Sequence, residues 1–223
     1  MSIHFQSVLD GYVELLDYMG NDLDIIQGAR ISTGSQSKGE EQDKRLLRYL
    51  MINSHTSPFE LVEFKFEIKA PLFVVAQWQR HRTWSYQQKS MRYTSDDISF
   101  YSPLMWRKQA EDNKQASTME PVVDNEFFKV LHDQHIQNSI DLYNMMLDAG
   151  VARELARIEL PTALYTTFIA KVDAHNLMNF IRLRYENHAQ WEIRQYAEAL
   201  LRIMKDILPW TTEEFMKKNG ITL

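Results

Sequence analysis

One run of alternating side chains places the strongest constraint on how this chain folds. Val62, Phe64, Phe66 and Ile68 alternate strictly with charged residues, and Pro71 ends the run. Successive side chains of a strand point to opposite faces of a sheet, so a period of two is typical of a strand with one buried face. The run therefore predicts a strand in a sheet that buries one of its two faces.

Caps, helical periods and β-branched runs predict the remaining elements. No element is predicted for the polar stretch Asp96–Asp124, and Lys217 and Lys218 are predicted to lie at a solvated end of the chain. We find no internal repeat and no linker, so the expected fold is one α+β domain over residues 1–223, with a mainly antiparallel sheet packed by helices. The predicted elements are two short strands within Phe5–Met19, helices over Asp22–Ile31, Glu40–Ile52, Leu72–Gln79, Asp124–Ala149, Val151–Leu160, Asp173–Tyr185 and Ile193–Ile207, and a strand over Thr162–Val172.

The composition is ordinary for a globular protein that works in water. Of the 223 residues, 44% are hydrophobic and 25% are charged. No apolar run approaches the roughly 20 residues that a bilayer-spanning helix needs. The start of the chain has no basic segment and carries Asp10, so a secretory signal is not expected. We therefore expect a cytoplasmic protein that does not associate with membranes.

The chain contains no cysteine. Disulfides, thiolate metal sites and a cysteine nucleophile are therefore excluded. His132 and His135 lie three residues apart on a predicted helix, as a pair of metal ligands would, but the sequence indicates no third ligand. An exposed helix face is the preferred interpretation of this pair, and no metal site is predicted.

Charge is distributed unevenly along the chain. The net charge is −5 and the pI is about 5.8, so the surface as a whole is not expected to attract nucleic acid. Residues 70–95 nevertheless contain no acidic residue, while Arg80, Arg82, Lys89 and Arg92 all fall within them. A local cationic patch on an acidic protein suits a small anionic ligand better than a polyanion.

The cationic segment is also dense in hydrogen-bond donors. Arg80 and Arg82 flank His81, which gives a fork of donors suited to phosphate or pyrophosphate. A solvated basic face, with Trp78 and Trp84 packed in the core, is one alternative. Another is a single-stranded nucleic-acid-binding module that stacks bases on the aromatic rings of residues 78–93. That module predicts a basic domain, whereas this chain is acidic.

The order of residues from Arg80 to Tyr93 resembles the signature motif of the flavin-dependent thymidylate synthases. The pattern is Arg-His-Arg, two residues, Ser, four residues, Ser, one residue, Arg-Tyr. The resemblance extends from Gly11 to Trp210 in the family's order, except that Ser99–Glu126 has no clear counterpart. The further matching blocks are Gly11–Leu15, Met19–Leu23, His55–Glu60, Ala156–Pro161, Asn176–Phe180, Arg182–Arg184 and His188–Ile193.

The resemblance implies a homotetramer whose active sites lie between subunits. It implies FAD as the cofactor and dUMP, methylenetetrahydrofolate and NADPH as ligands, in the methylation of dUMP to dTMP. A flavoprotein that binds nucleotide without synthase activity is a further alternative. By resemblance Arg184 is catalytic, and dUMP meets Gln77, Trp78, Gln79, Arg80, Gln88, Lys89, Ser90, Met91, Arg92, Arg157 and Arg184. The residues implied for FAD are Ser57, Arg80, His81, Arg82, Gln88, Asp173, Ala174, His175 and Asn179, together with Ser32, His55, Glu60 and His188.

The residue chemistry agrees with the implied reaction. The other class of thymidylate synthase attacks uracil C6 with a cysteine thiolate, which this chain lacks. A guanidinium near the uracil oxygens and N3 favours the N3 anion and raises the electron density of the ring, which is the role implied for Arg184. No G-x-G spacing occurs, so a Rossmann phosphate loop is excluded and the FAD pyrophosphate must meet side-chain cations.

Some positions differ from the common family form or carry a second interpretation. Gln87 and Gln88 stand where many members have Asn and Glu, and Asp173 and His175 stand where others often have Asn and Arg at the flavin. These differences bear on individual FAD contacts rather than on the class of reaction.

No histidine–carboxylate pair is evident in the sequence beside Ser90, so Ser90 is interpreted as a hydrogen-bond donor to the substrate rather than as a nucleophile.

Overall fold

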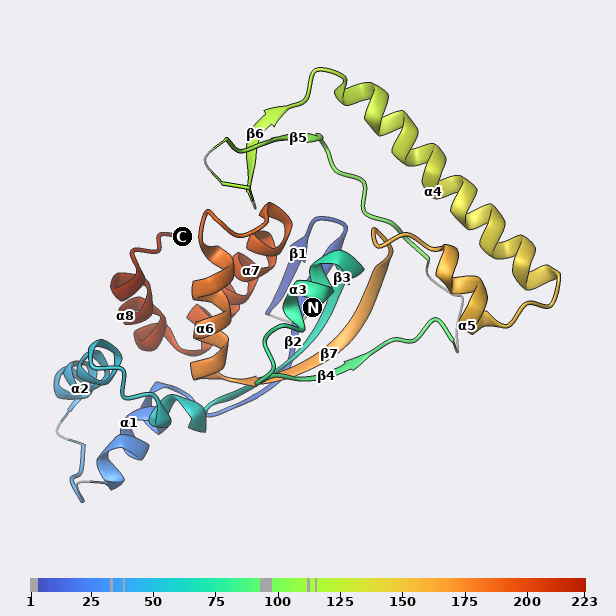
Figure 1. Cartoon of the computed structure of the whole chain (residues 1–223). Helices are drawn as coiled ribbons and strands as arrows, with labels where there is room; N and C mark the ends of the chain where they lie inside the picture. Colours follow the sequence, from blue (N-terminus) through green and yellow to red (C-terminus); the bar gives the residue numbers. More distant parts are fainter. Residues whose placement is uncertain (1–3, 33, 38, 93–97, 112, 115) are drawn as a thin grey trace.

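A five-stranded sheet forms the centre of the molecule (Figure 1). The computed structural model describes residues 4–32, 34–37, 39–92, 98–111, 113–114 and 116–223. The strand order is β1-β2-β3-β7-β4, and every pairing among these strands is antiparallel, which confirms the expected sheet. The strands are β1 (Phe5–Val8), β2 (Gly11–Met19), β3 (Glu63–Pro71), β4 (Ser85–Gln88) and β7 (Tyr165–Asp173).

The alternation in β3 decides which face of the sheet is buried. Phe66 and Ile68 are fully buried and lie opposite Ala170 and Phe168 of β7, which are buried as well. The residues between them in β3 are less buried and lie on the other face. A shift of one residue in this register would turn the buried rings to the outside, so the sequence pattern fixes the pairing.

Helices cover the buried face of the sheet, which confirms the α+β class (Figure 1). The amphipathic helix α7 contributes Ile193, Tyr196, Leu200 and Met204 to the core, and all four are fully buried, as their spacing predicts. The same core contains side chains of α1, α2, α3, α6, α8 and a short 3₁₀ helix, η1. These elements are α1 (Asp22–Ile31), α2 (Glu40–Ile52), η1 (Ser57–Leu61), α3 (Leu72–Trp78), α6 (Ala174–Tyr185), α7 (Trp191–Ile207) and α8 (Pro209–Asn219).

A second, smaller apolar cluster lies beside the long helix α4 (Asn125–Asp148). Tyr143 of α4 packs there with Ala156 of α5 (Arg153–Ala156) and with Leu160, which follows the 3₁₀ helix η2 (Arg157–Glu159). Figure 1 shows α4 running along the outside of the molecule, away from α6, α7 and α8. In the described part of the chain, no helix combines the length and apolar character needed to cross a bilayer.

The polar stretch Asp96–Asp124 contains a hairpin that the sequence pattern does not predict. Strand β5 (Arg107–Gln109) pairs antiparallel with β6 (Ser117–Pro121). Most side chains of both strands are exposed, so neither strand carries the alternation of apolar and polar residues that marks a buried face. Backbone pairing and polar side-chain contacts, such as the ion pair of Lys108 with Glu120 at 3.0 Å, hold this hairpin together.

Helix α8 is another element that sequence analysis does not predict. Pro209 ends the preceding helix, as predicted, but it also occupies the first turn of α8, where a missing N–H leaves no hydrogen bond unmade. Lys217 and Lys218 are exposed, as predicted, but Lys218 also makes contacts that the sequence does not predict. Its Nζ donates to the carbonyl of Met51 over 2.6 Å and to the hydroxyl of Ser54 over 3.1 Å, which ties α8 to the end of α2.

A buried carboxylate joins α1 to the start of α8. Asp22 is 5% exposed. Its Oδ1 accepts from the backbone N–H of Thr211 over 3.0 Å and from the Thr211 hydroxyl over 2.6 Å, and its Oδ2 accepts from the N–H of Trp210 over 2.9 Å. A negative charge at this position also complements the positive end of the helix dipole.

Replacing Asp22 is therefore expected to destabilise the fold strongly. Asp22→Ala leaves three donors without their acceptor, and we expect a loss of roughly 3 kcal/mol in the free energy of unfolding. Urea denaturation followed by tryptophan fluorescence measures the loss. Glu41→Ala is the control, because the Glu41 side chain makes an exposed ion pair with Arg45 at 3.8 Å and no other contact of this kind within the described residues, and its loss should be below about 0.5 kcal/mol. Equal losses for the two variants would contradict the role of Asp22.

Candidate active site

Arg184, the residue predicted to be catalytic, lies in the last turn of α6 and contacts the end of α3 and the loop that follows it. Its Nε donates to Nε2 of His81 over 3.0 Å, and its Nη2 donates to the carbonyl of Gln77 over 3.2 Å. Its Nη1 makes no hydrogen bond with the described residues. The protein therefore fixes two of the three guanidinium nitrogens and leaves the third available to a ligand.

Helix α6 brings a second side chain to the same contact. Phe180 lies one helical turn before Arg184, so both side chains project from one side of the helix. The Phe180 ring is fully buried, with its centroid 4.6 Å from the ring of Trp78 and 4.7 Å from the ring of His81. Apolar packing thus sets the distance at which Arg184 meets His81.

The environment keeps His81 neutral. Its side chain is buried, and burial together with the nearby charge of Arg184 lowers its pKa to about 4. Burial also lowers the pKa of Arg184 from its ordinary value, although a guanidinium keeps its charge at neutral pH. Because Nε2 of His81 accepts from Arg184, its ring proton belongs on Nδ1 in this arrangement.

The other predicted dUMP residues of α3 and β4 form a hydrogen-bonded row. Gln79 donates to Gln88 over 3.1 Å, and Gln88 donates to the hydroxyl of Thr166 on β7 over 3.3 Å. The side chains of Arg80 and Arg82 are exposed and make no hydrogen bond or ion pair with the described residues. Two unpaired cations beside this row can bind an anion without breaking an existing contact.

The aromatic rings of the same segment are packed inside the protein. Trp78 is fully buried and Trp84 is 5% exposed, and their rings meet edge to face with centroids 5.8 Å apart. Neither ring is accessible for stacking on a base, so the nucleic-acid-binding alternative finds no support. The indole of Trp78 is likewise out of reach of dUMP, and only its backbone remains for the implied contact.

The last described residues of the signature motif, Lys89–Arg92, lie near a different part of the chain from the first. Met91 packs against the second apolar cluster, which includes Ala156, the neighbour of Arg157. Arg157 is exposed, and the only hydrogen bond of its side chain among the described residues is a long one of 3.4 Å to the carbonyl of Glu154. Helix α5, which directly precedes Arg157, lies on the far side of the molecule from α6 in Figure 1. Lys89, Ser90 and Arg92 flank Met91, whereas Tyr93 lies outside the described residues.

The predicted dUMP residues thus form two groups within one chain. The first group gathers around Arg184 and the end of α3, and the second lies near Arg157 beside α4. The structure does not bring Arg157 and Arg184 together in a single chain.

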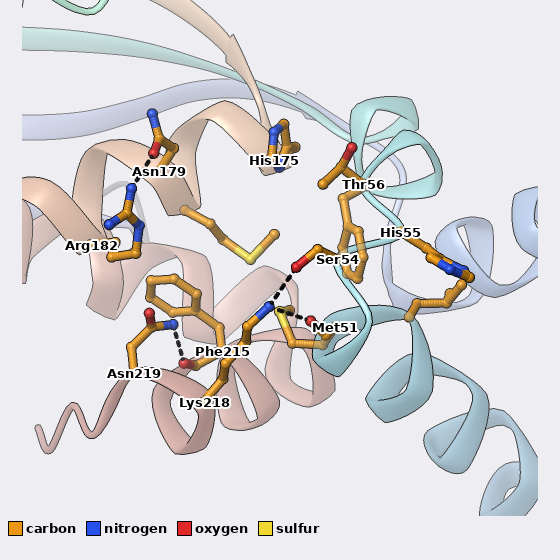
Figure 2. A pocket seen from close by; sticks show the side chains of 13 residues that line it. Met51, Ser54, His55, Thr56, His175, Asn179, Arg182, Phe215, Lys218 and Asn219 are labelled. Atoms are coloured by element: carbon orange, nitrogen blue, oxygen red, sulfur yellow. Dashed lines mark hydrogen bonds between the residues drawn. The ribbon is translucent and has the colours of Figure 1, made fainter.

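A pocket between α6, α8 and the end of α2 collects three of the predicted FAD residues (Figure 2). His55, His175 and Asn179 line this cavity of about 270 Å³, although they are far apart in sequence. In Figure 2, His175, Asn179 and Arg182 lie on one side and Lys218 on the opposite side. We call this cavity the first pocket.

A second pocket, of about 700 Å³, adjoins the first because Arg182 and Asn219 line both. It contains His188, another predicted FAD residue, whose Nδ1 lies 2.8 Å from the amide nitrogen of Asn113. Sequence analysis missed Arg182, Lys218 and Asn219 as pocket residues. Pro209 at the start and Gly220 at the end are the sequence signals that could have revealed α8 and, with it, two of these three.

The remaining predicted FAD residues lie outside both pockets. Ser57 and Glu60 are exposed on η1, and Ser32 at the end of α1 donates to the carbonyl of Ala29 over 2.7 Å. Ala174 is fully buried. The Asp173 carboxylate caps α6 by accepting from the N–H of Asn176 over 2.9 Å, as predicted from sequence. A carboxylate at this position therefore stabilises the helix, whether or not it also contacts a ligand.

No group of three or more potential metal ligands occurs in the described ranges of the chain.

His132 is more than an exposed helix residue. Its Nε2 lies 3.1 Å from the carbonyl of Tyr101, and its ring meets the edge of Trp106 with centroids 5.3 Å apart. The imidazole thus helps to hold the segment before β5 against α4.

The neutral state of His81 leads to a prediction about pH. The unfolded chain binds a proton at this histidine near the ordinary pKa of 6.5, whereas the folded chain resists protonation down to about 4. Stability is therefore unaffected above pH 6.5 and falls as the pH drops below it, by about 2 kcal/mol at pH 5.0 for the ligand-free protein. Denaturation at pH 7.5 and 5.0 should show a smaller fall for His81→Gln. Identical falls for the two proteins would show that His81 is not the group responsible.

Comparisons with known proteins identify the family of this chain. Residues 14–210 match the family model described as "Thymidylate synthase complementing protein". The flavin-dependent thymidylate synthase of Thermus thermophilus is 49% identical over 203 residues, which cover 91% of this chain and 74% of the relative. That of Thermosipho africanus is 45% identical over 215 residues, which cover 94% and 93% of the two chains.

Solved structures show the same fold. A UMP/dUMP methylase, PolB from Streptomyces cacaoi, bound with 5-Br dUMP, is 30% identical and superposes with a TM-score of 0.86 over 97% of this chain and 99% of that one. Its complex with 5-Br UMP gives a TM-score of 0.85 at 31% identity, over 96% and 97% of the two chains. The chain therefore belongs to the flavin-dependent thymidylate synthase family, methyltransferases whose cofactor is FAD.

Proposed function

We propose that residues 1–223 act as one domain that methylates dUMP to dTMP, with methylenetetrahydrofolate as carbon donor and NADPH as the source of reducing equivalents. Membership of the family supports the reaction, and the similarity to a methylase bound with 5-Br dUMP supports the substrate. A cytoplasmic location follows from the general place of thymidylate synthesis in the cell. The observation that carries the proposal is the guanidinium of Arg184, held by two contacts and open at its third nitrogen.

Arg184 acts on the uracil ring as an electrostatic catalyst. A positive charge beside the uracil oxygens stabilises negative charge on N3 and the oxygens, and this makes C5 a better nucleophile toward the one-carbon unit. Arg184 is held by neutral acceptors, His81 and the Gln77 carbonyl, rather than by a carboxylate. Its charge is therefore not neutralised by the protein and is available to the substrate.

The two adjoining pockets fit FAD. The first pocket has apolar walls, including Phe59 and Met178, with the amide of Asn179 and the cations Arg182 and Lys218 at its edge. A flat heteroaromatic ring with polar substituents matches that combination. The shared residue Arg182 leads into the larger polar second pocket, as an extended dinucleotide requires. His55, His175, Asn179, Arg182 and Lys218 would hold the cofactor, which supplies the hydride that completes the methyl group.

Unpaired arginines supply the charge for the anionic parts of these ligands. Arg80, Arg82 and Arg157 are exposed, and none of them forms an ion pair with the described residues. Each is therefore free to bind a phosphate group of dUMP or FAD, as the resemblance implies. The dUMP contacts of Ser90, Met91, Arg92, Lys89, Gln79 and Gln88 remain part of the proposal.

A homotetramer with shared active sites would complete the site. Within one chain the group around Arg184 and the group near Arg157 are separated, so a dUMP that touches both needs two subunits. Helix α4 also leaves an apolar stripe uncovered. At 100° per residue, Phe127, Leu131, Leu142 and Met145 fall within about 60° of one another, and they are 60%, 44%, 41% and 65% exposed. We propose that this stripe is a subunit interface.

Removing the guanidinium of Arg184 tests its catalytic role. Arg184→Ala should keep the fold and bind FAD but lose dTMP formation by at least about 100-fold, because the charge that stabilises the transition state is absent. Turnover is measured with dUMP, methylenetetrahydrofolate, NADPH and FAD, and UMP serves as a second substrate. Near-normal dTMP formation by Arg184→Ala would remove Arg184 from this role. No dTMP from the native protein, despite bound FAD, would favour the alternative without synthase activity.

Charges placed on the stripe of α4 test the assembly. The double variant Leu131→Glu/Leu142→Glu should dissociate the tetramer, because each interface would bury unpaired carboxylates. Light scattering coupled to gel filtration measures the mass, and turnover should fall along with the assembly. Asn144→Glu is the control, since it adds one carboxylate at an exposed position away from the stripe, and Leu131→Glu alone is the variant that matches it in charge. A native protein that is monomeric and fully active would contradict the shared site.

A further inference from the structure

Gln190, to which sequence analysis assigns no role, contacts the residue that holds Arg184. Gln190 lies directly before α7, and its side-chain oxygen accepts a hydrogen bond from the side-chain amide of Gln77. The carbonyl of Gln77 in turn accepts from Nη2 of Arg184 over 3.2 Å. Gln77 is therefore the single residue that links Gln190 to the guanidinium of Arg184, although Gln190 and Arg184 belong to different elements.

The position of Gln190 is set by a buried ion pair just beyond it. Arg107 of β5 donates to Oε1 of Glu192 over 2.6 Å, and Glu192 is 3% exposed. The hydroxyl of Tyr101 donates to the same carboxylate oxygen over 3.0 Å. The Arg107 guanidinium also lies over the ring of Trp191, 4.9 Å from its centroid. The two residues that follow Gln190 are therefore both held by Arg107.

The hairpin holds Arg107 from both of its strands. Arg107 belongs to β5, and its Nε donates to the hydroxyl of Ser117 on β6 over 2.9 Å. An ion pair buried this deeply resists separation, because either charge left alone would be buried without a partner. The hairpin, the start of α7, Gln77 and Arg184 therefore form a continuous chain of contacts.

We propose that Gln190 is a positioning residue for Arg184, acting through Gln77, and that the β5–β6 hairpin fixes Gln190 through the pair Arg107–Glu192. The inference rests on the proposed catalytic role of Arg184. An arginine has a long and flexible side chain, so its guanidinium keeps a productive place only if its acceptors are fixed. Displacement of a catalytic group by about 1 Å can lower a rate by roughly 100-fold.

A matched pair of variants tests the contact. Gln190→Met keeps the length of the side chain but removes the acceptor for Gln77, whereas Gln190→Glu keeps an acceptor and places a negative charge where the start of α7 favours one. With Gln190→Met we expect kcat for dTMP formation to fall about 10-fold, with FAD content, KM for methylenetetrahydrofolate and melting temperature close to native. Gln190→Glu should retain kcat within about threefold of native. Equal losses for the two variants would overturn the proposal.

Combining the change with a substitution at Arg184 shows whether Gln190 acts through that residue. In an Arg184→Lys background, Gln190→Met should have no further effect on the residual kcat, because the group it positions is already gone. Losses that multiply would overturn the positioning role. Arg184→Ala is assayed alongside: near-normal turnover of that variant would overturn the role of Arg184 itself, so the failure of the proposed mechanism is distinguished from a failure at Gln190.

Discussion

The hydrogen bond from Arg184 to the neutral ring of His81 is the contact on which the candidate site depends. A guanidinium usually meets a carboxylate inside a protein, and such a partner would cancel the charge on which the proposed role of Arg184 depends. His81 accepts the bond without adding charge, because burial and the nearby Arg184 keep its pKa low. The packing of Phe180 against Trp78 and His81 then holds α6 and the loop after α3 at the distance that this bond needs.

Much of the frame around this contact is readable from the sequence because it depends on local periodicity. The alternation of Phe64, Phe66 and Ile68 indicates the buried face of β3, and the spacing of apolar residues along α7 indicates the face that covers it. The cap of α6 by Asp173 follows from residue type and position as well. The resemblance of the Arg80–Tyr93 pattern to a known family added the chemistry, which periodicity alone does not supply.

The parts that the sequence does not reveal depend on contacts between distant segments. Lys218 belongs to a pocket only because α8 turns back onto the end of α2, and no local pattern records that turn. The hairpin of β5 and β6 is polar on most of its surface, so it has no periodic signal, yet its Arg107 reaches the buried Glu192. Likewise, the separation of Arg157 from Arg184 within one chain is a property of the folded structure. The signature motif is continuous in the sequence, whereas the fold places its first and last residues beside different parts of the molecule.

Helix α6 explains how one short element can serve two ligands. His175, Asn179 and Arg182 are spaced by four and three residues, so they share one side of the helix and line the first pocket. Phe180 and Arg184 are spaced by four residues and project roughly 140° to 180° away from that side, toward α3. Arg182 and Arg184 are only two residues apart, but the helical period sends one to the proposed flavin pocket and the other to the proposed uracil site. Because both sets of side chains move with the same rigid backbone, a change that rotates α6 would displace the residues of the first pocket and Arg184 together.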